Sequence, residues 1–170
     1  YFFVVPDYQR EYVWKPDDQV EQFLIDIDNE YDANTSNQKS YFIGSIIIVE
    51  NDGKYDVIDG QQRLTSIILS LCAFRDLLKS LALDDKQKKY LQTIEELLSD
   101  FDINTDETKL RLELQYEESK GYLSCLIENK TFTDTKSASI IKMEQAYIRI
   151  KEHFSTYLNI DTNSLVSYAR

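Results

Sequence analysis

The sequence predicts an α+β protein in which a small mixed sheet packs with helices and a helical lobe is appended. Three observations predict this class: a short β-patterned run at residues 2–5, a β-hairpin pattern at residues 41–58, and amphipathic helical patterns after it. The chain has 170 residues, of which 42% are hydrophobic, enough to bury one core. We therefore expect a core domain at residues 1–80 and a helical extension at residues 81–170.

The elements before residue 60 follow from spacing and turn chemistry. Pro16 suits the first turn of a helix whose apolar side chains recur at helical spacing, and Asp52-Gly53 is typical of a tight hairpin turn. The sequence predicts an irregular stretch at 7–14, a helix at 16–31, a polar loop at 32–40, a strand at 41–49 and a return strand at 55–58.

Helical patterns dominate after residue 60. An apolar stripe begins at Leu64 and continues for about four turns to Leu78. Leucines alternate with charged residues at 110–114, which is typical of a half-buried strand. The other predicted segments are a helix at 85–98, a polar stretch at 99–108, helices at 117–128 and 138–158, and a truncated helix at 164–170.

Composition excludes several function classes. The formal net charge is −11, so the molecule should repel nucleic acid overall, and any DNA contact has to be local or supplied elsewhere. Cys72 and Cys125 lie in apolar helical patterns without metal-ligand spacing, and we interpret them as buried thiols in a reducing compartment rather than a disulfide or metal pair. His153 is the single histidine, which excludes histidine metal clusters and catalytic triads within this chain.

The ends of the chain and its hydropathy predict location. No apolar run reaches the length of a membrane span and no signal-peptide pattern is present, so we expect a soluble, cytoplasmic protein without membrane contact. Because the chain has no initiator Met, we expect it to be a fragment of a longer protein.

The segment between the return strand and the long helix carries the most chemistry, and it reads Asp59-Gly60-Gln61-Gln62-Arg63. The first turn of a helix has unpaired N–H groups and about half a positive charge, which together bind phosphate. Arg63 adds a cation, the glutamines add donors and acceptors, and Asp59 can orient water or hold a metal ion. The alternative is an ordinary turn with a helix cap, which needs no ligand.

A second polar segment, Tyr8-Gln9-Arg10, lacks a clear amphipathic period. Arg10 can bind phosphate as a fork, while an aromatic neighbour such as Tyr8 or Trp14 can stack on a base. The alternative is a packed loop in which the aromatic rings belong to the core and Arg10 pairs with a carboxylate such as Asp59.

Three motifs occur in one order: Pro6-Asp7-Tyr8-Gln9-Arg10 with Trp14, then Tyr41-Phe42-Ile43-Gly44-Ser45, then Asp59-Gly60-Gln61-Gln62-Arg63-Leu64-Thr65. Together they resemble the N-terminal domain of GmrSD-type modification-dependent restriction systems, most strongly over residues 4–78. The resemblance implies a ParB/sulfiredoxin-like fold whose strand-to-helix turn binds nucleotide phosphates. It also implies nucleoside triphosphate hydrolysis, coupled in many members to recognition and cutting of modified foreign DNA in phage defence, often with a separate C-terminal histidine-dependent nuclease domain.

The resemblance further implies roles for individual residues. The nucleotide-hydrolysis motif comprises Asp59, Gly60, Gln61, Gln62 and Arg63, and a second wall of the same cleft comprises Tyr8, Gln9 and Arg10. Thr65 and Ser66, one turn into the helix, are expected to touch phosphate. Ser66 stands where a second Thr is common in the family, a change that keeps a hydroxyl in place.

In the expected mechanism, the phosphates of a nucleoside triphosphate lie over the N–H groups of residues 60–63, and Arg63, with Arg10, neutralises charge as the terminal bond breaks. Asp59 holds Mg²⁺ or its water, and Gln61 or Gln62 positions the attacking water. The expected partners are the nucleotide and, in the full-length protein, DNA, with a homodimer or a nuclease-domain partner left open. Two rival interpretations are a nucleotide- or modified-DNA-sensing module without turnover and an interaction scaffold.

Overall fold

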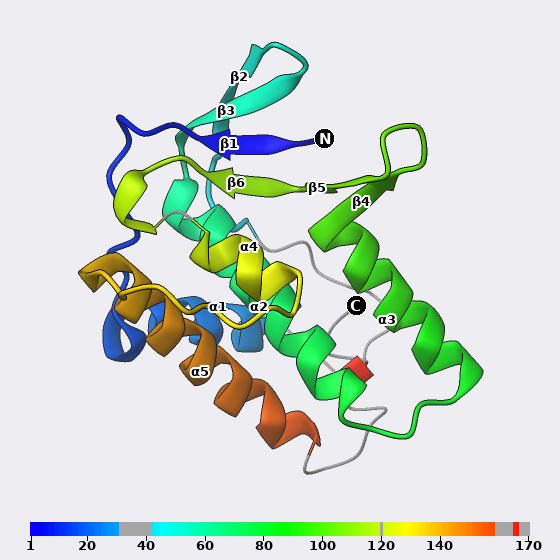
Figure 1. The fold of residues 1–170 in the computed structure, drawn as a ribbon. Coiled ribbons are helices and arrows are strands. Elements are labelled where there is room, and N and C mark those ends of the chain that lie inside the picture. Colours follow the sequence, from blue (N-terminus) through cyan, green and yellow to red (C-terminus); the bar gives the residue numbers. More distant parts are fainter. Residues whose placement is uncertain (31–41, 120, 159–164, 167–170) are drawn as a thin grey trace.

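The computed structural model describes residues 1–30, 42–119, 121–158 and 165–166. A four-stranded sheet lies against a layer of helices (Figure 1). The strand order is β2 (Ile47–Asn51), β3 (Lys54–Asp59), β1 (Phe3–Val5) and β6 (Leu112–Leu114). Strand β1 is parallel to both of its neighbours, whereas β2 is antiparallel to β3. The predicted α+β class with a mixed sheet is therefore confirmed.

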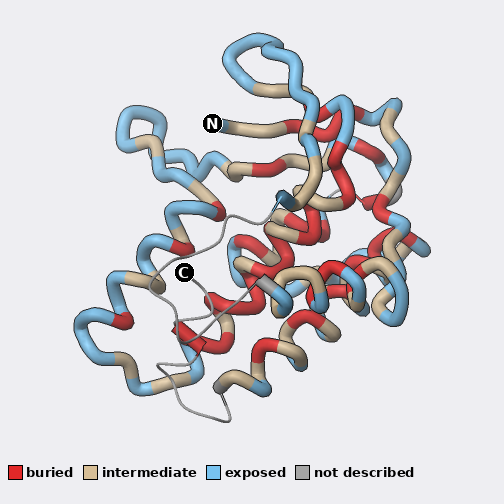
Figure 2. The backbone as a smooth tube through the Cα atoms, turned by 180° about the vertical axis from the view of Figure 1, so that it is seen from behind, coloured by how far each residue is buried: buried red, intermediate tan, exposed pale blue. Residues whose placement is uncertain are grey.

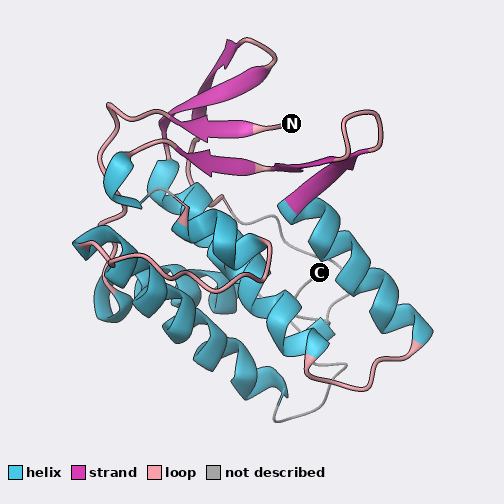
Figure 3. Cartoon of the chain, viewed as in Figure 1, coloured by secondary structure: helices cyan, strands magenta, loops and turns pink. Residues whose placement is uncertain are grey.

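Strands β2 and β3 form the predicted hairpin around a two-residue turn. Asp52 and Gly53 have φ angles of +48° and +77°, the left-handed pair typical of a type I′ turn. The strand predicted at 41–49 is wrong in its bounds, because β2 begins only at Ile47. Gly44, with a φ of +97°, interrupts the extended backbone, and the described residues just before β2 form a loop (Figure 3).

The helix predicted from Pro16 is present. It begins as a short π-helix, η1 (Pro16–Val20), and continues as α1 (Glu21–Glu30). The irregular stretch predicted at 7–14 is confirmed, since it contains no helix or strand. The predicted helix end at residue 31 and the predicted loop at 32–40 lie outside the described residues.

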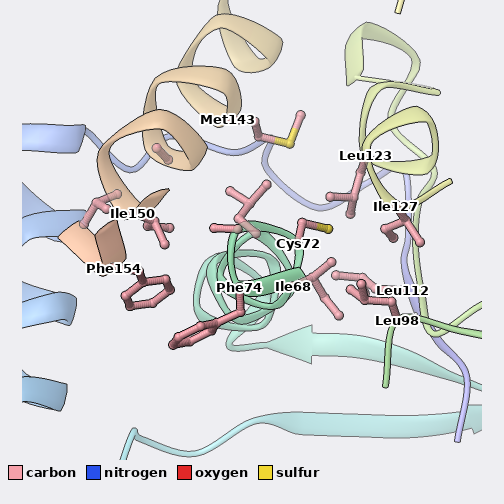
Figure 4. Packing of buried hydrophobic residues seen from close by; sticks show 14 of the residues in the cluster. Ile68, Cys72, Phe74, Leu98, Leu112, Leu123, Ile127, Met143, Ile150 and Phe154 are labelled. Carbon is pink, nitrogen blue, oxygen red and sulfur yellow. The ribbon is translucent and has the colours of Figure 1, made fainter. Parts of the chain in front are cut away.

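Helix α2 (Gln61–Lys79) runs through the middle of the molecule and begins at Gln61, one turn before the predicted apolar stripe starts at Leu64. The residues of that stripe all lie in or against the hydrophobic cluster, but buried side chains also surround the rest of the helix. Helices α3 (Asp85–Leu98) and α5 (Ala138–Leu158) pack along it, and Figure 4 shows Cys72 and Phe74 pointing to different sides of α2. A helix with neighbours on several sides needs small and polar buried residues as well as an apolar face.

Helices α3 and α5 match their predicted bounds of 85–98 and 138–158. Helix α3 begins with a capping box, in which the Asp84 side chain accepts from the Gln87 N–H and the Gln87 side chain accepts from the Asp84 N–H. This local signal fixes the start of the helix.

Two predictions between these helices are wrong. The polar stretch at 99–108 forms most of a hairpin, β4 (Ser99–Asp102) and β5 (Glu107–Leu110), whose residues are largely exposed and so lack the alternation that predicts a strand. The strand predicted at 110–114 is split at Arg111, whose backbone N–H donates to Leu98 O.

The helix predicted at 117–128 is also split. A 3₁₀ turn, η2 (Glu117–Ser119), is followed by α4 (Tyr122–Ile127), and Gly121 between them has a φ of +85° that interrupts a continuous helix. Of the helix predicted at 164–170, only residues 165 and 166 are described, and both are helical and buried.

One hydrophobic cluster fills the space between the sheet and the helices (Figures 2 and 4). It includes Val5 and Val57 from the sheet and Met143 and Phe154 from α5. The cluster and the sheet therefore both contain residues from each side of position 80. The division into a core domain at 1–80 and a helical extension stays a prediction.

The cysteines are free thiols, as predicted, but only Cys72 is buried, since Cys125 is half-buried. Burial raises the pKa of the Cys72 thiol to about 12, so it stays protonated and unreactive at neutral pH. His153 lies on α5, with Nε2 3.1 Å from the Asp28 carboxylate. None of the described helices is long and apolar enough to cross a membrane.

Candidate functional site

A cavity of about 440 Å³ opens where β3 ends and α2 begins, and we call it the motif cavity. Its lining residues come from the first 14 residues and from the strand-to-helix junction: Gln9, Arg10, Trp14, Ile58, Asp59, Gly60, Gln61, Gln62 and Arg63. The resemblance implied that residues 8–10 and 59–63 form two walls of one cleft. The structure brings Gln9 and Arg10 together with residues 59–63 there.

The first turn of α2 has free backbone donors. Gly60, with a φ of +87°, precedes the helix and has no side chain to cap it, and the first helical bond runs from Leu64 N to Gly60 O at 2.9 Å. Within the described part of the chain, the N–H groups of Gln61, Gln62 and Arg63 therefore have no acceptor. Three adjacent donors at the positive end of a 19-residue helix favour an anion.

Gln62 is fully engaged with the backbone of the N-terminal segment. Its Oε1 accepts from Val13 N at 2.8 Å, and its Nε2 donates to Glu11 O at 2.9 Å. The residue is buried, so both bonds lie away from bulk water. The Gln62 side chain therefore bonds to the backbone of residues 11–13 as a neighbouring strand would, and it holds these residues against α2.

Gln61 is only half engaged. Its Nε2 donates to Arg10 O at 3.0 Å, while its Oε1 is buried and has no partner among the residues that the structure describes. Leaving a buried acceptor unpaired costs about 1–3 kcal/mol, and such groups in native proteins call for an explanation such as a ligand or an ordered water. Gln61 is therefore the member of the glutamine pair with an acceptor to spare.

Arg63 holds the loop that precedes β2. Its Nη1 donates to Ser45 O at 3.0 Å and lies across Gly44, where a Cβ atom would come within 2.0 Å of Nη1. A Cβ atom on Gly60 would lie 3.0 Å from Ile46 Cγ1 and 3.1 Å from Ser45 O. Glycine at both positions permits this close approach. Gly44 was not among the expected site residues, although its place in the motif at residues 41–45 was a usable signal.

Asp59 and Arg10 line the cavity with exposed side chains. Within the described ranges, neither side chain has a hydrogen bond or an ion pair, so the alternative in which Arg10 pairs with Asp59 is not what the structure describes. The neighbouring Gln9 is anchored, since its Nε2 donates to Ile58 O at 3.2 Å. The cavity thus offers a guanidinium and a carboxylate that are both available to a ligand.

Three expected site residues are not brought to the cavity. Tyr8 is 69% exposed and lies outside the lining. Thr65 and Ser66 are buried within the fold, and the Ser66 hydroxyl donates to Gln62 O at 2.9 Å and lies 2.9 Å from the Tyr12 hydroxyl. Burial raises the pKa of Tyr12, which stays a neutral hydrogen-bonding partner for Ser66.

The donor set limits the metals that the site can hold. No group of three or more His, Cys, Asp or Glu side chains gathers among the residues that the structure describes. A single carboxylate, Asp59, is suited to Mg²⁺, which is commonly held by one or two carboxylates together with substrate phosphates. The site therefore fits a metal that arrives with a phosphorylated ligand.

The fold and the cavity define an α+β domain with a polar cavity at a strand-to-helix junction, lined by residues from two of the three short motifs. The chain belongs to the family described as GmrSD restriction endonuclease, N-terminal domain, which matches residues 1–169. The resemblance inferred from the motifs is confirmed, and the chain is a domain of a restriction system, whereas the ParB/sulfiredoxin-like detail of its fold stays a prediction. No match was found among curated proteins.

Proposed function

We propose that the motif cavity binds a nucleoside triphosphate with Mg²⁺ and hydrolyses it, and that the full-length protein uses this reaction in restricting modified foreign DNA during phage defence. The observation that carries the proposal is the open first turn of α2. Its three free N–H groups lie at the positive end of the helix, where phosphate oxygens are stabilised.

The two glutamines have different roles in this proposal. Gln62 has no free amide atom, because both its oxygen and its nitrogen are bonded to the backbone of residues 11–13. Gln61 lines the cavity and keeps a buried Oε1 without a partner among the described residues. Turning this amide toward the cavity would let Oε1 accept a hydrogen bond from water. Gln61 therefore orients the attacking water, and Gln62 positions the wall beside it.

Asp59 would hold Mg²⁺ through its free carboxylate. When bound, Mg²⁺ neutralises charge on the phosphate oxygens. In the reaction, the water oxygen bonds to the terminal phosphorus while the bond to the bridging oxygen breaks. The products are a nucleoside diphosphate and inorganic phosphate, and the proton of the water passes to solvent.

The test is release of inorganic phosphate from each common nucleoside triphosphate with Mg²⁺, using the chain and two matched variants. Asp59→Asn removes the cavity carboxylate, and we expect turnover to fall at least about 100-fold, the usual scale for losing one group that stabilises the transition state. Asp134→Asn removes an exposed carboxylate outside the cavity and should turn over normally.

Two results would contradict hydrolysis. Tight nucleotide or DNA binding without phosphate release would favour a sensing module. A melting temperature unchanged by every nucleotide and DNA tried would favour an interaction scaffold.

A further inference from the structure

We propose that Arg10 supplies the guanidinium that contacts the phosphate groups of the bound nucleotide, and that Arg63 is a positioning residue that builds the cavity wall. The inference rests on the proposed function and deepens it. It departs from the expectation drawn from the sequence, in which Arg63 was the main cation.

The contacts of Arg63 are structural. Its Nη1 donates to Ser45 O, and the guanidinium occupies the space that a side chain at residue 44 would fill. That packing fixes the loop before β2 against the start of α2. Arg63 also lines the cavity, and its other guanidinium N–H groups have no described bond, but turning the side chain further toward a ligand would break the bond from Nη1 to Ser45 O.

Arg10 is free where Arg63 is engaged. Its side chain is exposed at the cavity and has no hydrogen bond or ion pair with any described residue. Its guanidinium carries several N–H donors in a planar fork that matches phosphate oxygens. In a chain with a net charge of −11, an unpaired arginine beside a carboxylate that it does not neutralise is available for an incoming anion.

The backbone around Arg10 is held in place. Gln61 Nε2 bonds to Arg10 O, Gln62 Nε2 bonds to Glu11 O, and Gln9 Nε2 bonds to Ile58 O on the strand side. Ordering only the side chain of Arg10 on binding loses less conformational entropy than ordering a loose segment would. The glutamines of one motif thus present the arginine of the other.

The experiment uses calorimetry to measure the binding of two ligands. One is the imido analogue of the triphosphate that the chain turns over fastest, and the other is the matching unphosphorylated nucleoside. Arg10→Ala should weaken binding of the triphosphate about 10- to 100-fold, leave nucleoside binding unchanged and leave the melting temperature unchanged. Arg10→Lys should recover part of the affinity, because it keeps the charge without the fork. Arg63→Ala should lower the melting temperature and weaken both ligands alike, and Arg63→Lys, which keeps one donor for Ser45 O, should do so less.

Lys86→Ala serves as the control, since it removes one exposed cation from α3 outside the cavity lining, and it should bind both ligands normally. Unchanged triphosphate affinity in Arg10→Ala would overturn the inference and leave the proposed function standing. Selective loss of triphosphate binding in Arg63→Ala at an unchanged melting temperature would also overturn it. Failure of the unaltered chain to bind any nucleotide would overturn both.

Discussion

The two ends of α2 differ in whether their buried polar groups have hydrogen-bond partners. Near its C-terminal end, Arg75 is fully buried, yet its guanidinium is satisfied: Nε bonds to the Asp76 carboxylate at 2.8 Å, Nη2 donates to Leu126 O at 2.8 Å, and Nη1 donates to Ile127 O. Asp76 in turn accepts from the Tyr147 hydroxyl at 2.6 Å. This network ties α2 to the end of α4 and to α5.

At its N-terminal end, the same helix leaves polar groups unpaired. Gln61 Oε1 and Thr65 Oγ1 are buried without partners among the described residues, and the first-turn N–H groups have no described acceptor. The Tyr116 hydroxyl is the third such side-chain group in the described ranges. Unpaired buried groups destabilise a fold, so the presence of two of the three at one end of one helix calls for an explanation beyond the fold itself. The C-terminal end, with its polar groups bonded, is an anchor for the neighbouring helices, and the N-terminal end holds the candidate site.

The largest expected effect belongs to the anchor. Arg75→Ala should lower the free energy of unfolding by about 3 kcal/mol or more, because two carbonyls and a carboxylate lose their bonds to the guanidinium together and the removed side chain leaves a buried cavity. Urea unfolding measures it. Arg149→Ala breaks a half-exposed ion pair with Glu21 and should cost at most about 1 kcal/mol. Equal losses in the two variants would contradict the role of Arg75 as an anchor.

A smaller loss of stability is expected at Gly44, in the loop before β2 that Arg63 contacts. Gly44→Ala should destabilise the fold by about 1–3 kcal/mol, because the new Cβ would clash with Arg63 and the φ of +97° disfavours alanine. The melting temperature and the urea midpoint measure the loss.

Gly53 provides the matched control for this prediction. Its φ is +77°, but a Cβ atom there would have nothing within 4 Å, so Gly53→Ala should cost only the backbone strain. Combining Gly44→Ala with Arg63→Ala should cost less stability than the sum of the two single variants, because Arg63→Ala removes the side chain that the new Cβ would meet. Simple additivity in the double variant would show that Arg63 does not pack on Gly44.

Sequence reasoning succeeds where a local signal decides the outcome. The bounds of α3 follow from a capping box and a helical period, and the hairpin turn follows from Asp52-Gly53. The resemblance to the family implied that the two polar motifs share one cleft, and the structure places Gln9 and Arg10 beside residues 59–63. Sequence reasoning fails for β4 and β5, because an exposed two-stranded hairpin has no buried face and so its sequence shows no alternation of apolar and polar residues.

The candidate site shows a second limit. Gln61 and Gln62 are identical in type, yet their free and bonded atoms differ because their partners lie 51 residues away along the chain. Sequence alone does not reveal which amide atom is satisfied by a distant carbonyl. The same holds for Arg10 and Arg63, whose roles separate only once Ser45 and Gly44 are placed.

The smallest expected effect on stability lies on the β4–β5 hairpin, whose residues are largely exposed, unlike the buried polar groups at both ends of α2. A hydrogen bond from Lys109 and a second from the Asn104 N–H lower the pKa of the Asp102 carboxyl to about 2. Since the folded pKa lies below its ordinary value of 3.8, the carboxylate stabilises the fold above that value, and the contribution disappears as the pH falls through about 2. Asp102→Asn should therefore be slightly less stable than the unaltered chain at pH 7, by less than either variant above, because both partners are solvent-exposed and screened. Urea midpoints should converge as the pH is lowered toward 2, whereas Asp134→Asn should show no such convergence. A pH-independent difference for Asp102→Asn would mean that its side chain contributes through shape or backbone geometry and not through charge, and that even exposed polar groups in this fold act as anchors.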